Sequence, residues 1–548
     1  MRSAVTHERG RGFDGAAAFE ETRARESRRA SGRARARAGE EARRVVAWTG
    51  VALALRVALL FGVEHVITPD GVMYAGLVRA LAAGRFAEGL STYWPPLYPA
   101  LAAAASLLFA DVELAGRIVS VVAGALVVVP VYRLARDSYG RDAARLAASL
   151  AALHPLLVYY STLVLTESVY TLLFACGACA GWSAVSETSA RKFLTAGAIF
   201  GACYLLKPEA AGFVLLLVAL ALAARVFSEK RASLKTSLLG ACAACAGFLV
   251  VASPYLVYLR RETGGWILSG KLAGHLWQGS RRAGESAPQV AGLFPDATTA
   301  VVQLTKALRY EYELLNLLFP TAFVVAAALG LFASRWTRER ARRELYLLLF
   351  FAATLAGYAV TLPNVRFLVP LTPLVICWTA RGVGELERWA GATARRAGVA
   401  ENLRRVGARL FRPAVVALLL LSLLPMFVYL LRGDKWGDYY GQKRAALWIR
   451  DEARTRGDAA PAVMSTAPVA AFYAGGRHVA LVDEETAELV ERARREGVSY
   501  VVINERGVKE TRLRRLLDPA QAPPALRLAH GLAESPEHRI LVYTLASP

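Results

Sequence analysis

The sequence has few cysteines for its length. Only 6 of its 548 residues are cysteine, and none lies within residues 433–548, so that segment has no disulfide framework. Cys176 and Cys179, and Cys242 and Cys245, repeat a C-x-x-C spacing, but both pairs lie in Ala/Gly-rich apolar runs. Small residues in such runs favour close helix packing, which is the preferred interpretation over a zinc or redox site.

Acidic residues are also scarce. The chain has 44 Asp and Glu against 66 Lys and Arg, which gives a formal net charge of +22. Residues 1–44 have almost no large apolar side chains, and their Arg-, Ala- and Glu-rich composition predicts a disordered basic arm. Because basic residues gather on the cytoplasmic side of membrane proteins, we expect this arm to be cytoplasmic and disfavour nucleic acid binding.

Two sequence patterns are missing. No helix opens with a Gly-rich phosphate-binding fingerprint, because "YAGGRH" (473–478) is too short and lacks the required spacing. No half of the chain repeats the other, whereas transporters often contain such repeats. This disfavours a membrane transporter or flippase of a lipid or glycan, which remains the alternative to an enzyme. A receptor domain anchored by many spans is a weaker alternative.

Apolar sequence is abundant. The chain is 55% hydrophobic with a mean hydropathy of +0.35. It contains repeated apolar windows of about 20 residues, the length that crosses a bilayer core. This pattern therefore predicts that residues 45–432 form a polytopic α-helical membrane domain of about eleven transmembrane helices. The expected spans are 45–63, 114–134, 146–160, from 169, 193–206, from 210, 238–259, 317–332, 345–362, 367–380 and 413–431.

The distribution of basic loops predicts the orientation. Placing "ARDSYGRDAAR" and "SRWTRERARRE" in the cytoplasm puts loops 66–113 and 260–316 on the outer face. Within the first loop, Val72 to Ala83 predicts a short helix. "PPLYPALAAAASLLFA" predicts a re-entrant or interfacial segment, since a full crossing would move the later basic loops outside.

After residue 432 the composition becomes that of a small soluble α/β domain, 433–548, on the extracytoplasmic side. Alternating helical and strand patterns predict a parallel-type layer. The expected helices are Gln442 to Arg454, one around Ala470, and Glu484 to Glu496; the expected strands are Ala462 to Ser465, His478 to Val482, and Tyr500 to Asn504.

Ionisable residues mark the predicted outer ends of the spans: Asp70, Glu167, Lys207, Glu209 and Arg366. Structural alternatives remain open: Asp70 could cap a helix, and Glu167 could cap the fourth span or pair with a neighbour. Lys207 and Arg366 could extend to the membrane surface. The convergence of these residues on one membrane face favours a joint role. The cations would bind a lipid phosphate as leaving group, while a carboxylate accepts a proton from an attacking hydroxyl.

An ordered set of segments carries a family resemblance. The segments "PDGVMYAGLVRALAAGRF", "YWPPLYP", "STLVLTE", "GACYLLKPEAAG" and "NVRFLVPLTPL" resemble the C-type (GT-C) glycosyltransferase superfamily. The similar branch contains the protein O-mannosyltransferases and the lipid A aminoarabinose transferase (glycosyltransferase family 39-like). The resemblance covers most of residues 45 to 435, more strongly in the first half, and implies a GT-C fold.

The resemblance implies roles for particular residues. Asp70 matches the first-loop acid, a catalytic base or acceptor-orienting group. Donor phosphate binding is implied for Lys207 and Arg366, with Glu167 and Glu209 beside them; Tyr74, Tyr98 and Arg117 are possible supporting residues. Relatives usually have a second acid beside the first, where this chain has Gly71. We therefore favour a metal-independent reaction, although Glu64 or Glu167 could approach Asp70 to hold a divalent metal.

The expected function is inverting transfer of a hexosyl or pentosyl unit from a polyprenyl-phosphate donor to a protein, lipid or glycan hydroxyl. The transfer would take place at the cell membrane, in the cell envelope. His275, Trp277 and Arg281 in the long outer loop could bind the acceptor or lie at the membrane interface, and the interface is preferred.

Overall fold

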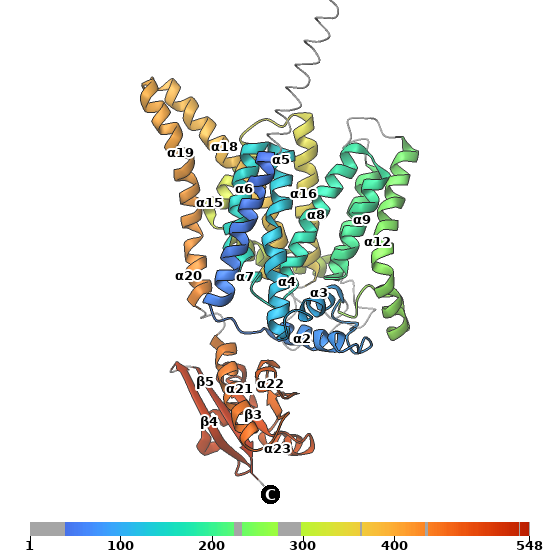
Figure 1. Cartoon of the computed structure of the whole chain (residues 1–548), viewed down its shortest axis with the longest axis vertical. Coiled ribbons are helices and arrows are strands. Elements are labelled where there is room, and N and C mark those ends of the chain that lie inside the picture. Colours follow the sequence, from blue (N-terminus) through green and yellow to red (C-terminus); the bar gives the residue numbers. More distant parts are fainter. Residues whose placement is uncertain are drawn as a thin grey trace, which may run out of the picture.

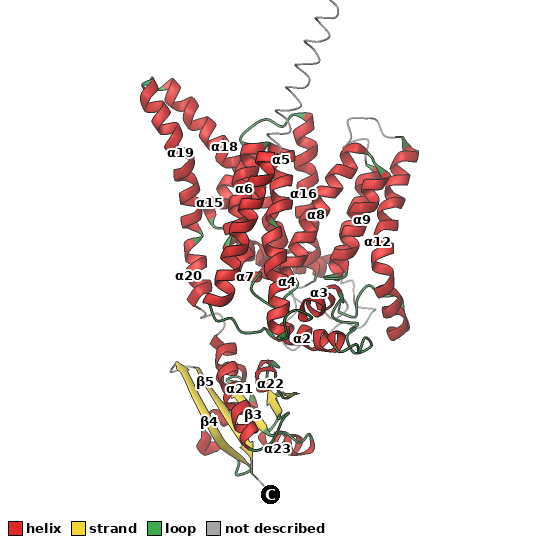
Figure 2. Ribbon diagram, viewed as in Figure 1, coloured by secondary structure: helices red, strands yellow, loops and turns green. Residues whose placement is uncertain are grey.

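The computed structural model describes residues 39–223, 233–271, 297–361, 364–432, 437–535 and 538–546. It consists of a helical bundle with a small sheet-containing domain at one end (Figures 1 and 2). After a first helix, Gly39–Gly62, the bundle contains α4 (Val112–Leu126), α5 (Val128–Tyr139), α6 (Arg141–Leu153), α7 (Pro155–Tyr160), α8 (Glu167–Glu187), α9 (Ala190–Tyr204), η1 (Pro208–Ala210), α10 (Ala211–Leu222), α12 (Leu234–Thr263), α14 (Ala297–Leu318), α15 (Thr321–Phe332), α16 (Arg338–Val360), α17 (Val365–Leu368), η4 (Val369–Leu371), α18 (Thr372–Arg396), α19 (Glu401–Ser422) and α20 (Leu424–Arg432).

The first helix includes residues 39–44, which the sequence assigned to the disordered arm; the rest of that arm lies outside the described residues. Each predicted span coincides with helical structure. However, the described residues contain only 6 helices long and apolar enough to cross a membrane, or up to 7 when a bent pair counts as one span. The predicted number of about eleven is therefore not confirmed.

The shortfall in spans has a structural cause. Several predicted spans are short or broken helices, such as α9 and α10. The chain bends by 103° between Leu304–Leu318 and Thr321–Phe332, next to Pro320. Proline cannot continue a helix without losing a hydrogen bond, which accounts for a break there. Helix α14 also occupies part of the predicted outer loop 260–316.

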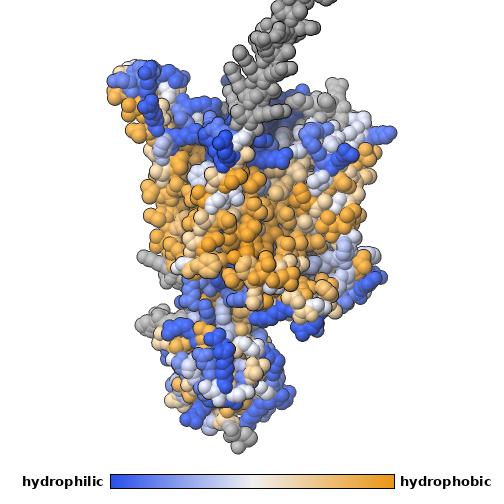
Figure 3. Space-filling model, in the orientation of Figure 1, coloured by the Kyte–Doolittle hydropathy of each residue, from blue (hydrophilic) through white to orange (hydrophobic). Residues whose placement is uncertain are grey.

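The surface of the bundle is banded. On the face seen in Figure 3, an apolar band crosses the middle of the bundle, with hydrophilic residues at both ends. Two short helices, α2 (Pro69–Ala82) and α3 (Leu97–Ser106), lie at the end next to the sheet domain (Figure 1). Helix α2 agrees with the predicted short helix. Helix α3 has 10 residues, too few to cross a bilayer, as expected for an interfacial segment.

Glycines bring helices α15 and α18 into close contact. A Cβ added at Gly382 would lie 1.7 Å from the carbonyl oxygen of Ala326, and one at Gly330 would lie 2.1 Å from that of Trp378. The C-x-x-C region behaves similarly, because a Cβ at Gly247 would lie 2.0 Å from the Leu194 oxygen. Small residues thus set the helix spacing, as membrane helix packing requires.

Gly382→Ala is expected to destabilise the bundle by about 1–3 kcal/mol, because its methyl group overlaps backbone that cannot rotate away. Gly384→Ala is the matched control, since nothing lies within 4 Å of a Cβ there. Thermal unfolding of the purified proteins in detergent measures the difference. Equal midpoints for the two variants would show that the α15–α18 contact does not depend on Gly382.

The C-terminal domain has a five-stranded sheet with strand order β2-β1-β3-β5-β4. Helices α21 and α22 contact one face, whereas α23 and η6 contact the other. Its elements are α21 (Gly437–Thr455), β1 (Ala462–Ser465), α22 (Val469–Ala474), β2 (Arg477–Ala480), α23 (Thr486–Arg495), β3 (Tyr500–Asn504), α24 (Glu505–Val508), η6 (Arg512–Leu517), η7 (Pro519–Gln521), β4 (Leu526–Ser535) and β5 (His538–Leu545).

The predicted helices and first three strands are present, with shifts of a few residues at their ends. Strands β1, β2 and β3 are parallel. Strands β5 and β4 add an antiparallel pair that the sequence analysis did not predict. The prediction of a parallel-type layer is therefore corrected to a mixed sheet, because β5 pairs with β3 in the opposite direction.

Candidate functional site

Four charged residues from distant parts of the chain meet at the end of the bundle that faces the C-terminal domain. Asp70 lies in the first turn of α2, Glu167 begins α8, Lys207 lies between α9 and η1, and Arg366 lies in α17. An Arg366 guanidinium nitrogen lies 2.6 Å from Asp70 Oδ2. Its Nε lies 3.9 Å from Glu167 Oε1, and Lys207 Nζ lies 3.2 Å from the same oxygen. The result is one continuous ion network.

Other residues cap the helices that carry Asp70 and Arg366, so neither of these two side chains is used as a cap. The N-cap of α2 is Thr68, whose hydroxyl accepts a hydrogen bond from the Gly71 amide. Asp70 is therefore not the cap, so the capping alternative is wrong for this carboxylate. Asn364 caps α17 by accepting from the Arg366 amide, which fixes the backbone that presents the guanidinium.

The Glu167–Lys207 pair is almost fully enclosed. The Glu167 side chain is 2% exposed and that of Lys207 is 8% exposed. Lys207 Nζ also lies 4.4 Å from the centre of the Phe367 ring, a favourable cation–π position. Buried charges are tolerated when paired, so these two side chains depend on each other.

These residues line a small cleft with a volume of about 20 Å³, room for about one water molecule. Its walls include Trp94 and Lys271, and the Lys271 Nζ lies 4.9 Å from the centre of the Trp94 ring. Burial lowers the pKa of Lys271, while the nearby Glu209 and Asp70 carboxylates oppose that shift. The sequence analysis missed Lys271, because nothing in "SGKLAG" sets this lysine apart from an ordinary loop residue.

Two other predicted residues also line the cleft. Tyr74 packs edge-on against Trp94, with ring centres 5.1 Å apart, and its burial raises the pKa of its hydroxyl well above the usual value. Glu209 has a buried Oε2 atom without a hydrogen-bond partner among the described residues. Glu167 Oε2 is in the same state. The cleft therefore contains carboxylate oxygens that could accept hydrogen bonds from a bound ligand.

Tyr98 and Arg117 do not line this cleft. The Tyr98 hydroxyl donates to the Gly116 carbonyl at 2.9 Å and lies behind Tyr74 in the core. Arg117 donates to the His65 carbonyl and pairs with Glu113. Both residues hold helix α4 in place, and the supporting role expected for them stays a prediction.

The described residues contain no cluster of three or more His, Cys, Asp or Glu side chains placed to hold a metal ion. Glu64, considered as a second acid for Asp70, instead pairs with Lys443 of α21 at 2.6 Å. His275, Trp277 and Arg281 lie outside the described residues.

The C-terminal domain contacts the loop that leads to Asp70. The hydroxyl of Tyr473 in α22 accepts a hydrogen bond from the Ile67 amide at 3.0 Å and donates to Glu113 Oε1 at 3.0 Å. The Arg79 guanidinium of α2 lies 4.8 Å from the centre of the Phe472 ring. Helix α22 therefore holds both ends of the segment that positions Asp70.

Tyr473→Phe is expected to loosen this segment, because it removes both hydrogen bonds while keeping the ring. Amide exchange of a peptide covering residues 64–74 should become about fivefold faster, as for the loss of roughly 1 kcal/mol. Tyr312→Phe, which changes an exposed tyrosine of α14, is the control. Unchanged exchange in Tyr473→Phe would mean that the contact does not restrain the loop.

Comparisons with known proteins agree with this fold. ArnT from Cupriavidus metallidurans, solved with undecaprenyl phosphate, matches with a TM-score of 0.55 at 13% identity, covering 91% of this chain and 97% of that chain. Its apo state matches with the same TM-score at 14% identity. Archaeal oligosaccharyltransferase AglB from Archaeoglobus fulgidus, solved with an inhibitory peptide and dolichol-phosphate, gives a TM-score of 0.51 at 14% identity, covering 88% of this chain and 71% of that chain.

These likenesses, together with the apolar helices, define a multi-pass membrane protein with the fold of the C-type glycosyltransferases. The family described as dolichyl-phosphate-mannose-protein mannosyltransferase matches residues 94–258, which supports assignment of the chain to the GT-C superfamily. The matched segment contains Glu167 and Lys207, whereas Asp70 and Arg366 lie outside it. No curated protein sequence shows a significant match.

Proposed function

We propose that the chain is an integral-membrane glycosyltransferase that moves a monosaccharide from a polyprenyl-phosphate donor to an acceptor hydroxyl. The observation that carries this proposal is the ion network of Asp70, Glu167, Lys207 and Arg366 at one end of an apolar bundle. The structural relatives solved with undecaprenyl phosphate and with dolichol-phosphate support a lipid-linked donor.

The reaction takes place on the extracytoplasmic face in this proposal. Helix α2, whose Asp70 lines the cleft, lies at the same end of the bundle as the C-terminal domain, opposite the α18–α19 connection (Figure 1). The arginine-rich residues 395–412 lie at this connection, in the end of α18 and the start of α19, and basic segments remain in the cytoplasm. The N-terminus is then cytoplasmic and the C-terminal domain extracytoplasmic.

The cations of the cleft would bind the donor phosphate. Lys207 and Arg366 already face carboxylates, so the phosphate competes with Asp70 and Glu167 for them. The cleft is too small for a sugar phosphate, and the Arg366–Asp70 contact must therefore open when the donor enters. Opening transfers the positive charge to the phosphate and leaves Asp70 free to accept a proton.

Transfer is then a single displacement with inversion. The acceptor oxygen attacks the anomeric carbon, and the bond from that carbon to the phosphate oxygen breaks with its electron pair on the phosphate. Lys207 and Arg366 stabilise the departing polyprenyl phosphate, while the acceptor proton passes to the Asp70 carboxylate. Asp70 later releases this proton to water.

The proposal is tested by incubating the purified protein with a panel of polyprenyl-phosphate sugars. The expected result is loss of one lipid-linked sugar with wild type but not with Asp70→Asn. If neither protein consumes a lipid-linked sugar while wild type moves a lipid or glycan across vesicles, the chain is a transporter or flippase instead.

A further inference from the structure

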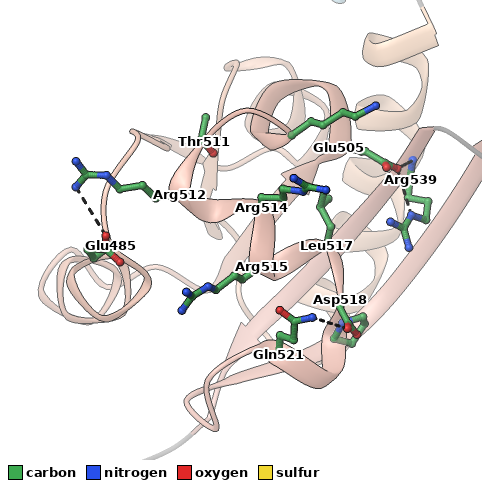
Figure 4. A pocket seen from close by; sticks show the side chains of 12 residues that line it. Glu485, Glu505, Thr511, Arg512, Arg514, Arg515, Leu517, Asp518, Gln521 and Arg539 are labelled. Atoms are coloured by element: carbon green, nitrogen blue, oxygen red, sulfur yellow. Dashed lines mark hydrogen bonds and ion pairs between the residues drawn. The ribbon is translucent and has the colours of Figure 1, made fainter.

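The C-terminal domain contains a second polar concavity, separate from the cleft. It is an open groove of about 820 Å³ (Figure 4). We call it the basic groove. Residues from α24, η6, η7 and β5 form most of its lining, and the cations among them outnumber the carboxylates. Its charged residues are Lys509, Arg512, Arg514, Arg515, Arg539, Glu485, Glu505 and Asp518.

Several of these cations have no carboxylate partner among the described residues. Arg539 pairs with Glu505 at 3.2 Å, and Arg512 lies 3.9 Å from Glu485 with both side chains 63% exposed, so the second pair is weak. Within the part of the chain that the structure describes, Arg514 and Arg515 form no side-chain ion pair. Figure 4 accordingly draws no interaction line to either guanidinium.

The remaining acid of the groove is already satisfied. The Asp518 carboxylate accepts from the Ala520 amide at 3.0 Å and from the Gln521 side-chain amide at 2.9 Å. It therefore stabilises the η7 turn, and among the described residues it forms no ion pair with the arginines. The groove keeps an excess of positive charge that faces solvent, and unpaired guanidinium groups bind phosphate and carboxylate oxygens well.

The groove also lies where this type of sheet usually binds ligands. Glu505 follows directly on β3, and Glu485 lies in the connection between β2 and α23. Both therefore lie beyond the carboxyl ends of parallel strands, where open α/β sheets form ligand-binding crevices.

We propose that the basic groove binds an anionic glycan segment of the acceptor, through phosphate or carboxylate groups, with Arg514, Arg515 and Lys509 as its principal cations. This inference deepens the proposed glycosyltransferase function. That the bound glycan is the acceptor rests on the proposed function, whereas the binding of an anionic glycan does not. Leu517 and Pro519 are the apolar residues of the lining, and Thr511 and Gln521 are its uncharged polar residues.

The lining residues disfavour other partners. No aromatic side chain is among the described residues that line the groove. Single-stranded nucleic acids bind by stacking bases on aromatic rings, and protein partners usually bury an aromatic or large apolar anchor. A ligand recognised by regularly placed negative charges fits better.

Contacts of α21 and α22 attach the domain that carries the groove to the bundle. Tyr473 binds the Ile67 amide and Glu113, and Lys443 pairs with Glu64, so the domain is attached to the loop that presents Asp70. An acceptor chain held on the domain is thereby kept near the cleft at a raised local concentration.

The test uses the full chain in nanodiscs of neutral phosphatidylcholine, so that no anionic lipid competes. Fluorescent polyphosphate, polygalacturonate and a single-stranded oligonucleotide are the probes, and binding is followed by anisotropy at several salt concentrations. We expect wild type to bind polyphosphate or polygalacturonate, with affinity that falls as salt rises. Arg514→Gln/Arg515→Gln should weaken this binding about tenfold or more.

Arg494→Gln/Arg495→Gln is the matched control, because it removes the same charge from exposed positions of α23 outside the groove. Preference for polyphosphate or for polygalacturonate identifies the anionic group. The inference is overturned if neither polyanion binds wild type, if the control loses as much affinity as the groove variant, or if the oligonucleotide binds most tightly. Binding of an undecaprenyl-phosphate sugar, measured in parallel, should be unchanged in the groove variant; its absence in wild type would count against the glycosyltransferase function alone.

Discussion

Asp70→Asn should lower the turnover of a polyprenyl-phosphate sugar by about 10²–10⁴-fold, the usual contribution of a general base. The amide keeps the size of the carboxylate but cannot accept the acceptor proton. Donor KM should change much less, because Lys207 and Arg366 remain in place. Initial rates of donor consumption at saturating donor measure the effect.

Glu262→Gln is the control for Asp70→Asn, since it neutralises an exposed acid of α12 without an ion pair among the described residues. It should retain wild-type turnover. If Asp70→Asn were fully active with intact folding, the carboxylate would not be the proton acceptor, and its contact with Arg366 would be structural only.

Lys207→Met should destabilise the bundle by about 3 kcal/mol, the cost of leaving a buried carboxylate without its partner. Glu167 is 2% exposed, and its remaining cation would be Arg366, at 3.9 Å. Donor affinity should also fall about tenfold or more, since a charged hydrogen bond to phosphate is lost. Thermal unfolding and donor titration measure the two effects separately.

The double variant Glu167→Gln/Lys207→Met separates stability from function. Replacing both partners removes the unpaired buried charge, so most of the lost stability should return, while donor affinity should stay low. A double variant as unstable as Lys207→Met would show that the Glu167 charge is not the cause. A double variant that binds the donor like wild type would show that Lys207 does not contact the phosphate.

The gathering of the charged residues could be anticipated because membrane topology limits where span ends can lie. Asp70 and Arg366 are 296 residues apart in sequence, yet both adjoin predicted outer ends of spans and meet in the structure. Lys271 could not be found this way, because it lies in a loop and its place at the cleft depends on tertiary contacts, such as those with the Tyr93 and Trp94 rings. Arg117 also lies near the outer end of a predicted span, but its side chain contacts Glu113 and His65. Sequence spacing alone does not reveal this orientation.

The fold, like the site, could be predicted from the sequence only in part. Helix α2 and strands β1 and β3 were predictable from local patterns, because their periodicity and end signals are clear. The number of spans was not, since breaks such as the bend beside Pro320 depend on how neighbouring helices pack. "HRILVYTL" has the β-branched and aromatic composition of a strand, so β5 was detectable, but its antiparallel pairing with β3 depends on tertiary contacts.

The structure of Asp70→Asn bound to a polyprenyl-phosphate sugar tests the central claim most directly. We predict that phosphate oxygens lie about 3 Å from Lys207 Nζ and from the Arg366 guanidinium, with the anomeric carbon facing residue 70. A lipid phosphate bound elsewhere, with the Arg366 and Lys207 contacts to Glu167 unchanged, would contradict it.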